Sequence, residues 1–197
     1  MARFTLEERE KIKEDIITKG KQLFTVYGLK KTSIDDIVQS CDIGKGTFYR
    51  FFKSKEELYF EILEREEEFR EELIKKMLQS NKSSKESFRA FLKECLKYVE
   101  NNEFLKQLNE RQEMDLLLRK LPKERVEEHF YKDKESGLLF IEKWQNEGKL
   151  IKENPEVIVG ILRSLFILVY SKEEIGENIY PFVIDRLIDI IVDGMCI

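Results

Sequence analysis

The sequence is poor in the two residues that most often interrupt helices. Only three prolines and nine glycines occur in 197 residues, while hydrophobic residues make up 42% of the chain and charged residues 38%. Short strands joined by tight turns need more turn-forming residues, and no segment of note alternates apolar with polar side chains. The chain is long enough for one compact unit or two small ones. We therefore predict an all-α protein.

Cysteine and histidine are also scarce. The three cysteines, Cys41, Cys95 and Cys196, are far apart, none belongs to a C-x-x-C pair, and His129 is the single histidine. This pattern disfavours a metal site or a disulfide framework, and we expect each cysteine to be a small buried hydrophobe. A redox-sensing role for Cys41 or Cys95 is the alternative.

Catalytic motifs and membrane-spanning segments are missing as well. The sequence has no G-x-S-x-G elbow and no glycine-rich phosphate loop, so we predict neither an enzyme nor a cofactor. Its longest apolar stretch, residues 157–170, contains Arg163 and is too short to span a bilayer. No signal peptide is recognisable. We expect a cytoplasmic protein without a membrane partner.

The charged residues that are present are unevenly distributed. The first 55 residues hold 12 basic and 8 acidic side chains, whereas the remaining residues hold 23 basic and 31 acidic ones. A basic N-terminal head on an acidic body is typical of a protein that contacts nucleic acid through its N-terminus.

The most informative segment of that head is TSIDDIVQSCDIGKGTFYRFFKSKEEL, residues 32–58. Its apolar residues recur at helical spacing and predict a short helix over residues 33–41. Thr32 and Asp35 are the predicted cap, because a hydroxyl and a carboxylate both suit the positive end of a helix.

A tight turn and a second helix follow. Asp42 tolerates a left-handed backbone, and Gly44 can cap the next helix, which we expect over residues 45–52. Phe48 and Phe52 are spaced to face the core together. Two short helices joined by such a turn predict a DNA-binding helix-turn-helix.

The outward face of the second helix suits a major groove. Its basic side chains can neutralise phosphates or reach guanine edges, its hydroxyls can contact phosphates or a thymine methyl, and its glycine allows close approach. A lysine at the start of the following helix can hold a phosphate. The alternative is a helical hairpin with a solvated basic face. The candidate DNA contacts are Lys45, Gly46, Thr47, Tyr49, Arg50 and Lys55.

The run GKGTFYRFFKSKEEL after TSIDDIVQSC resembles the N-terminal DNA-binding domain of TetR-family transcriptional regulators, over roughly residues 12–63. The resemblance implies DNA contact at Thr32 and Ser33 as well as at the residues just named. Gly44 stands where the family usually has a serine that caps the helix and touches a phosphate. The departures from the family's pattern are Cys41, Asp42 and Gly44.

The rest of the chain reads as a succession of helices. A first helix over residues 6–27, ended by Gly28, would brace the two reading helices. A long helix from residue 55 to about 79 would link head and body. We predict a DNA-binding domain of three helices over residues 1–54 and a helical ligand-binding and dimerisation domain over residues 55–197.

The last two predicted helices carry apolar residues on more than one face. A helix buried on two sides is most simply explained by a partner subunit, although two central helices of a monomer are the alternative. The resemblance also implies a homodimer, because TetR-family proteins dimerise through their last two long helices as a four-helix bundle. The candidate interface residues are Gly160, Ser164, Leu165, Val183, Leu187 and Ile191.

Aromatic residues are concentrated in the middle helices, where family members hold a small inducer. Aromatics at helical spacing usually pack in the core, but a pocket lined by them would take a hydrophobic or amphipathic ligand. The candidate ligand contacts are Phe88, Phe91, Tyr98, Gln112, Phe140 and Trp144.

These features predict a homodimeric transcriptional regulator, in this family most often a repressor. It would bind a palindromic double-stranded DNA operator and release it when a small-molecule effector binds. Two alternatives remain. One is a ligand-independent DNA-organising factor on the same fold, and the other is a protein-interaction module whose head has lost DNA binding.

Overall fold

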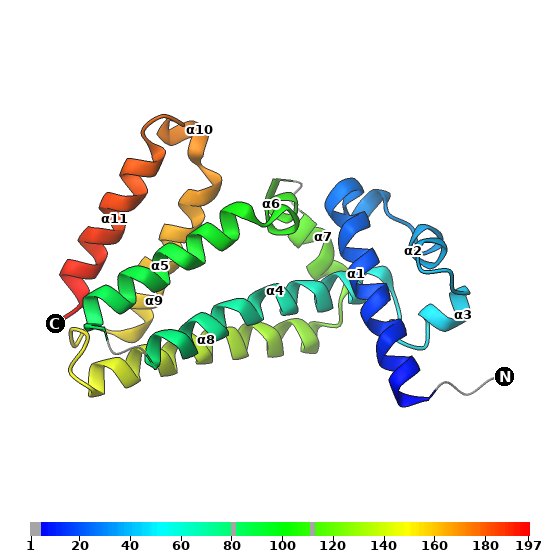
Figure 1. Ribbon diagram of the computed structural model, residues 1–197, viewed down its shortest axis with the longest axis horizontal. Coiled ribbons are helices and arrows are strands. Elements are labelled where there is room, and N and C mark those ends of the chain that lie inside the picture. The colour runs from blue at the N-terminus through cyan, green and yellow to red at the C-terminus, as the bar shows by residue number, and fades with distance from the viewer. Residues whose placement is uncertain (1–4, 80–81, 111–112) are drawn as a thin grey trace. The chain divides into compact units, whose positions relative to one another are not determined.

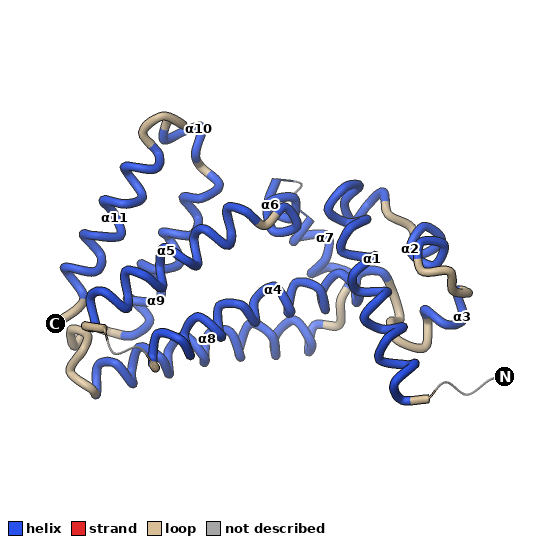
Figure 2. Tube along the Cα trace, viewed as in Figure 1, coloured by secondary structure: helices blue, strands red, loops and turns tan. Residues whose placement is uncertain are grey.

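The computed structural model describes residues 5–79, 82–110 and 113–197, and its regular elements are helices (Figures 1 and 2). They are α1 (Leu6–Lys31), α2 (Ile34–Ser40), α3 (Lys45–Phe48), α4 (Lys55–Leu78), α5 (Ser84–Asn101), α6 (Glu103–Glu110), α7 (Glu113–Lys120), α8 (Lys123–Asn146), α9 (Pro155–Ile167), the 3₁₀ helix η1 (Leu168–Tyr170), α10 (Lys172–Ile175) and α11 (Tyr180–Met195). The all-α prediction is confirmed. None of the described helices combines the length and the apolar composition that crossing a membrane requires.

The chain folds into two compact units. The first comprises residues 1–68 and 103–123, and the second comprises residues 69–102 and 124–197. α4 begins in the first unit and continues in the second, whereas α6 and α7 belong to the first. The helix-turn-helix therefore packs with residues far beyond position 54, where we placed the end of the DNA-binding domain. The predicted end of the DNA-binding domain at residue 54 remains a prediction.

α1 is interrupted near its end by a glycine. Its start carries a capping box in which the Thr5 hydroxyl accepts from the Glu8 amide and the Glu8 carboxylate accepts from the Thr5 amide. Gly28 has φ 77°, a backbone that L side chains rarely adopt, and helical geometry resumes for one turn after it. The predicted break at Gly28 is confirmed, and the extra turn ends at Lys31.

The cap of α2 differs from the predicted one. Ser33 is the cap residue: its hydroxyl accepts from the Asp36 amide at 3.1 Å, and the Asp36 carboxylate accepts from the Ser33 amide at 2.8 Å. The predicted pair of Thr32 and Asp35 is wrong, because Thr32 is 1% exposed and its hydroxyl donates to the Gly28 carbonyl at 2.8 Å.

The turn into α3 follows the prediction more closely. Asp42 has φ 53°, the one positive φ outside glycine among the described residues, and Gly44 caps α3 without a side-chain hydrogen bond. α3 ends at Phe48, and single turn-type hydrogen bonds then carry the chain to Phe52. Phe48 and Phe52 are 0% and 4% exposed, so both face inward as predicted.

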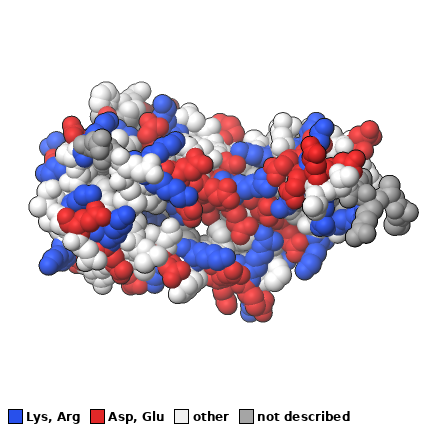
Figure 3. All heavy atoms as spheres, turned by 60° about the horizontal axis from the view of Figure 1, so that its bottom comes forward, with Lys and Arg blue, Asp and Glu red and all other residues white. Residues whose placement is uncertain are grey.

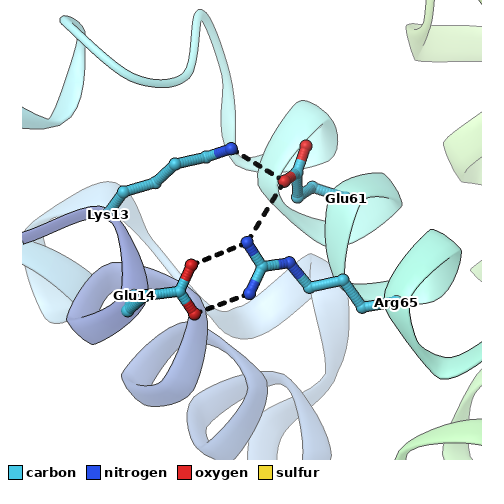
Figure 4. Close-up of polar contacts among 4 residues, drawn as sticks. All are labelled: Lys13, Glu14, Glu61 and Arg65. Atoms are coloured by element: carbon cyan, nitrogen blue, oxygen red, sulfur yellow. Dashed lines mark hydrogen bonds and ion pairs between the residues drawn. The ribbon is translucent and has the colours of Figure 1, made fainter. Parts of the chain in front are cut away.

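A network of charged side chains joins α1 to α4 within the first unit (Figure 4). The Arg65 guanidinium donates to both oxygens of the Glu14 carboxylate, at 2.6 and 2.8 Å. Glu61 accepts from Lys13 at 2.9 Å and lies 3.5 Å from Arg65. The Arg65 hydrogen bonds lower the pKa of Glu14. A two-pronged contact of this kind fixes geometry as well as charge, so it aligns the two helices.

The second unit is held together by aromatic rings. Phe88, Phe140 and Trp144 are buried, and their ring centroids lie 5.3 to 6.4 Å apart. Each pair is tilted, the arrangement that aromatic rings prefer to a face-to-face stack. The rings bring α5 and α8 together in a continuous apolar core to which α9 and α11 also contribute.

Basic residues of α5 and acidic residues of α11 form a ladder of ion pairs. Both sets are spaced four residues apart, so they lie on one face of each helix and run in opposite directions along the chain. The pairs are Lys85 with Asp193 at 3.6 Å, Arg89 with Asp189 at 2.8 Å and Lys93 with Asp185 at 2.9 Å.

The C-terminal residues are bonded to the loop before α9 and to the start of α5. Leu150 and Cys196 form an isolated β-bridge, with the Ile151 amide donating to the Met195 carbonyl at 2.9 Å. The Ile197 carbonyl accepts from the Ser84 hydroxyl at 3.1 Å. The end of α11 is therefore anchored on two other segments of its own unit.

Candidate nucleic-acid interface and effector cavity

The outward face of α3 carries exposed side chains, and its inward face is buried. Phe48 is fully buried, and the exposed ring of Tyr49 meets it edge-on with centroids 5.7 Å apart. A side chain added at Gly46 would meet no atom within 4 Å, so the space over this glycine is open. Lys45 and Arg50 are also exposed, and Thr47 is half-buried. Such a face can approach a groove of DNA without rearrangement of the core.

The charge of this face is partly compensated within the protein. The Lys45 ammonium lies 2.8 Å from the Asp35 carboxylate, and this hydrogen bond raises the pKa of Lys45. On α1, Lys13 and Lys21 are paired with acidic residues of α4. Acidic and basic side chains are correspondingly intermixed over the surface drawn in Figure 3. The basic excess of residues 1–55 therefore overstates the positive charge offered to DNA.

The two residues added by the resemblance are occupied in capping and packing. Ser33 is exposed, but its hydroxyl caps α2 and donates to the Asp36 carboxylate at 2.6 Å, which lowers the pKa of Asp36. Thr32 is buried, and its hydroxyl donates a hydrogen bond to the carbonyl of Gly28. Neither of these hydrogen bonds was predicted from the sequence.

Lys55 lies at the start of α4 with its ammonium directed at backbone carbonyls. Its Nζ donates to the carbonyl of Leu29 at 2.6 Å and to the carbonyl of Thr32 at 2.7 Å. Carbonyls at the end of a helix attract a cation, so Lys55 holds together the junction between α1 and α2.

A cavity of about 220 Å³ lies in the second unit among α4, α5, α8 and α9. Of the predicted ligand contacts, Phe91 and Phe140 line it. Phe88 and Trp144 pack in the ring cluster with Phe140, and Tyr98 is stacked on Phe69 with centroids 3.9 Å apart. Gln112 lies outside the described residues. The wall residues are Arg70, Ile74, Phe91, Leu92, Gly137, Phe140, Ile141, Val159, Leu162, Arg163 and Phe166.

The predicted interface residues differ in their exposure. Gly160 and Ser164 are exposed on α9, while Leu165 is 1% exposed and packs inside its own unit. Val183, Leu187 and Ile191 are partly buried against the same core or beside it. The large apolar side chains that these two helices do expose are Val157, Ile161, Ile167, Phe182 and Ile190.

The three thiols are removed from water to different degrees: Cys95 and Cys196 are buried and Cys41 is half-buried. Burial raises the pKa of Cys95 to about 12 and the pKa of Cys196 to about 11, and it raises the pKa of the half-buried Cys41 as well. Thiols react as thiolates, so these shifts disfavour the redox-sensing alternative. Within the described part of the chain, no three His, Cys, Asp or Glu side chains gather as a metal ion would require.

The comparison with known proteins agrees with this geometry. A sequence model of "Bacterial regulatory proteins, tetR family" matches residues 16–62, which contain α2 and α3. The chain is 44% identical over 55 residues to the uncharacterized HTH-type transcriptional regulator YhgD of Bacillus subtilis, and 36% identical over 77 residues to the HTH-type transcriptional regulator QacR of Staphylococcus aureus.

These matches span less than half of this chain and of each relative. They cover 28% and 39% of this chain and 27% and 41% of the two relatives. The likeness of the whole chain is one of fold. The fatty acid degradation regulator FadR of Bacillus halodurans superposes with a TM-score of 0.69 over 98% of both chains, at 13% sequence identity.

Proposed function

This chain belongs to the TetR family of bacterial transcriptional regulators, and from that premise we propose that it is a homodimeric repressor whose operator is released by a small effector. DNA binding and transcriptional regulation follow from the family. The relatives are named as regulators, which supports a role without catalysis. A repressor acts where the chromosome lies, so the proposed location is the cytoplasm.

The observation that carries the proposal is the exposed face of α3. Tyr49 is 53% exposed although its ring is held against buried Phe48, and Gly46 beside it leaves open space. We assign base and phosphate contacts to Lys45, Gly46, Thr47, Tyr49 and Arg50, with Ser33 at the edge of the interface. Thr32 and Lys55 would act from behind by shaping the α1–α2 junction.

Dimerisation is supported by the apolar residues exposed on α9 and α11. Phe182 is 75% exposed, Ile167 60% and Ile190 56%, and soluble monomers rarely leave a group of such side chains in water. A second copy packed on this face would cover them. Two heads related by a two-fold axis would then read half-sites about 34 to 36 Å apart on a palindromic operator.

The effector would bind in the cavity of the second unit. Its wall is largely apolar, with Phe91, Phe140 and Phe166 among the contacts, and it also contains the guanidinium-bearing Arg70 and Arg163. This composition suits a small amphipathic molecule. FadR of Bacillus halodurans is named for fatty acid degradation, which supports testing carboxylates with an apolar chain first.

Release would be a shift between two populations of the dimer. An effector that binds more tightly to the form whose heads no longer match the half-sites weakens operator binding. A coupling free energy of about 1 to 3 kcal/mol would lower operator affinity roughly 5- to 150-fold.

Selection of bound duplexes from a random DNA pool tests the proposal. We expect a palindromic consensus at near-physiological salt, and we expect Tyr49→Ala to lose it. Tyr27→Ala is the matched control, because Tyr27 is a similarly exposed tyrosine, at 55%, that belongs to α1 and not to α3. Recovery of no consensus from the wild-type protein would reject the function, and a consensus unaffected by Tyr49→Ala would reject the assignment of α3.

A further inference from the structure

Glu113 is a buried carboxylate outside the helix-turn-helix. It is the first residue of α7, and its side chain is 2% exposed. Burying a carboxylate costs free energy unless hydrogen-bond donors or positive charges compensate for the lost water. The partners of Glu113 therefore indicate what it contributes.

Both carboxylate oxygens accept hydrogen bonds from helices much earlier in the chain. Oε1 accepts from the Leu29 amide at 2.7 Å, and Oε2 accepts from the Tyr59 hydroxyl at 3.0 Å. The Tyr59 ring is fully buried, with its centroid 4.9 Å from that of Phe24 and 4.8 Å from that of Phe104. All of these residues belong to the first compact unit. Glu113 thus connects α7 with both α1 and α4.

The amide that Glu113 accepts from lies directly after the break in α1. Gly28 has positive φ, and amides that follow a break lack the carbonyl partner that a continuous helix supplies. Glu113 provides the Leu29 amide with an acceptor in a place that water does not reach. The break and the carboxylate are complementary features, although 84 positions separate Leu29 and Glu113.

Lys55 holds the carbonyl side of the same short segment. It donates to the carbonyls of Leu29 and Thr32, while the Thr32 hydroxyl donates to the carbonyl of Gly28. The next residue, Ser33, is the cap of α2. The backbone of residues 28–32 therefore sets where α2 begins. Because only a short turn joins α2 to α3, the position of α2 also determines that of α3.

We propose that Glu113 is a positioning residue for DNA binding, which fixes the α1–α2 junction through the Leu29 amide and the Tyr59 hydroxyl. The inference rests on the proposed function. It extends the part of the chain that sets the DNA-reading geometry to α7, well beyond the helix-turn-helix itself. Loss of the two hydrogen bonds would loosen the orientation of α3 without removing any residue that touches DNA.

Three variants test the role of the carboxylate. Glu113→Met keeps a similar volume but offers no strong acceptor, and we expect it to lower affinity for the duplex selected by the wild-type protein about tenfold or more. Glu113→Gln retains an amide oxygen for Leu29 and can donate to the Tyr59 oxygen, so it should stay within about threefold of wild type. Tyr59→Phe removes the hydrogen bond to Oε2 and keeps the one from the Leu29 amide to Oε1, so it should give an intermediate loss.

The readout that separates positioning from general stability is the Leu29 amide. Its ¹H–¹⁵N resonance should move, and its hydrogen exchange should accelerate, in Glu113→Met but not in Glu113→Gln. Leu117→Ala is the matched control, because Leu117 is fully buried on the same helix and its truncation lowers stability without removing an acceptor from Leu29. Below its melting temperature it should bind the duplex as wild type does.

Each outcome decides the question. Wild-type affinity in Glu113→Met, or an equal loss in Leu117→Ala, would overturn the positioning role. If Glu113→Met does not fold, Tyr59→Phe decides, and unchanged affinity in that variant overturns the proposal. Failure of the wild-type protein to select any duplex would instead refute the proposed function, and the inference with it, before a variant is compared.

Discussion

The ammonium of Lys45 on α3 lies 2.8 Å from the carboxylate of Asp35 on α2. The two side chains are exposed, so the pair contributes little to stability. It does affect DNA binding, because a phosphate that approaches Lys45 must compete with the carboxylate. Asp35 thus acts as a built-in competitor for one of the proposed phosphate contacts.

Asp35→Asn should therefore strengthen DNA binding. With its ammonium free, Lys45 can neutralise one more phosphate. The slope of log affinity against log salt concentration should therefore become steeper by up to about one unit. The change is measured by titrating labelled duplex at several salt concentrations. In a Lys45→Gln background the same substitution should change neither affinity nor slope, and an equal gain there would show that Asp35 acts by another route.

Lys55→Met should lower the stability of the first unit. The variant leaves the carbonyls of Leu29 and Thr32 without their charged donor, at an expected loss of about 1 to 3 kcal/mol in the free energy of unfolding. Denaturant titration measures it, with exposed Lys53→Gln as the control. The salt dependence of DNA binding should not change. A slope reduced by about one unit at unaltered stability would instead support the phosphate contact expected from the sequence.

Phe182→Asp should split the dimer without unfolding the protomer. Phe182 is 75% exposed on α11, so a charge there costs little within one chain but is unfavourable in an apolar interface. Sedimentation should report half the wild-type mass. Phe130→Asp on α8 is the control, because Phe130 is 47% exposed on a helix outside the proposed interface. An unchanged mass in Phe182→Asp would refute this face.

Stability should fall as the pH rises above about 9, the ordinary pKa of a thiol in the unfolded chain. Burial raises the pKa of Cys95 to about 12, so between these values the folded state keeps a proton that the unfolded state has lost. The contribution is at most about 1.4 kcal/mol per pH unit. Cys95→Ala should show a shallower fall in denaturant titrations at pH 8 to 10, and an identical slope would contradict the shift.

The short-range features of the head were predictable, because their causes lie within a few residues. Asp42 takes the positive φ that an Asp tolerates, and the spacing of Phe48 and Phe52 places both in the core. The cap of α2 was predicted one residue too early. The segment offers two hydroxyl and carboxylate pairs one residue apart, and the carbonyl of Gly28, four residues before Thr32, selects between them by accepting from the Thr32 hydroxyl.

Other contacts depend on distant parts of the chain and leave no local signal. The sequence predicts a phosphate contact for Lys55 because it begins a helix. In the fold its ammonium donates to the carbonyl of Leu29 on α1, a contact that the local sequence does not indicate. Leu165 belongs to an apolar stretch from which sequence alone does not say which side faces the core. Glu113 stands in a charged segment with nothing to mark it as buried, because its partners come from helices formed far earlier in the chain.

The ion-pair ladder between α5 and α11 does not by itself fix the register of the two helices. Its charges repeat every four residues on both helices, so α11 could slip by one helical turn and still match two of the three pairs. The hydrogen bonds of Met195 and Ile197 with Ile151 and Ser84 have no equivalent one turn away. These end contacts therefore specify a single register that the repeating charge pairs alone do not, and they add to the core packing of α11.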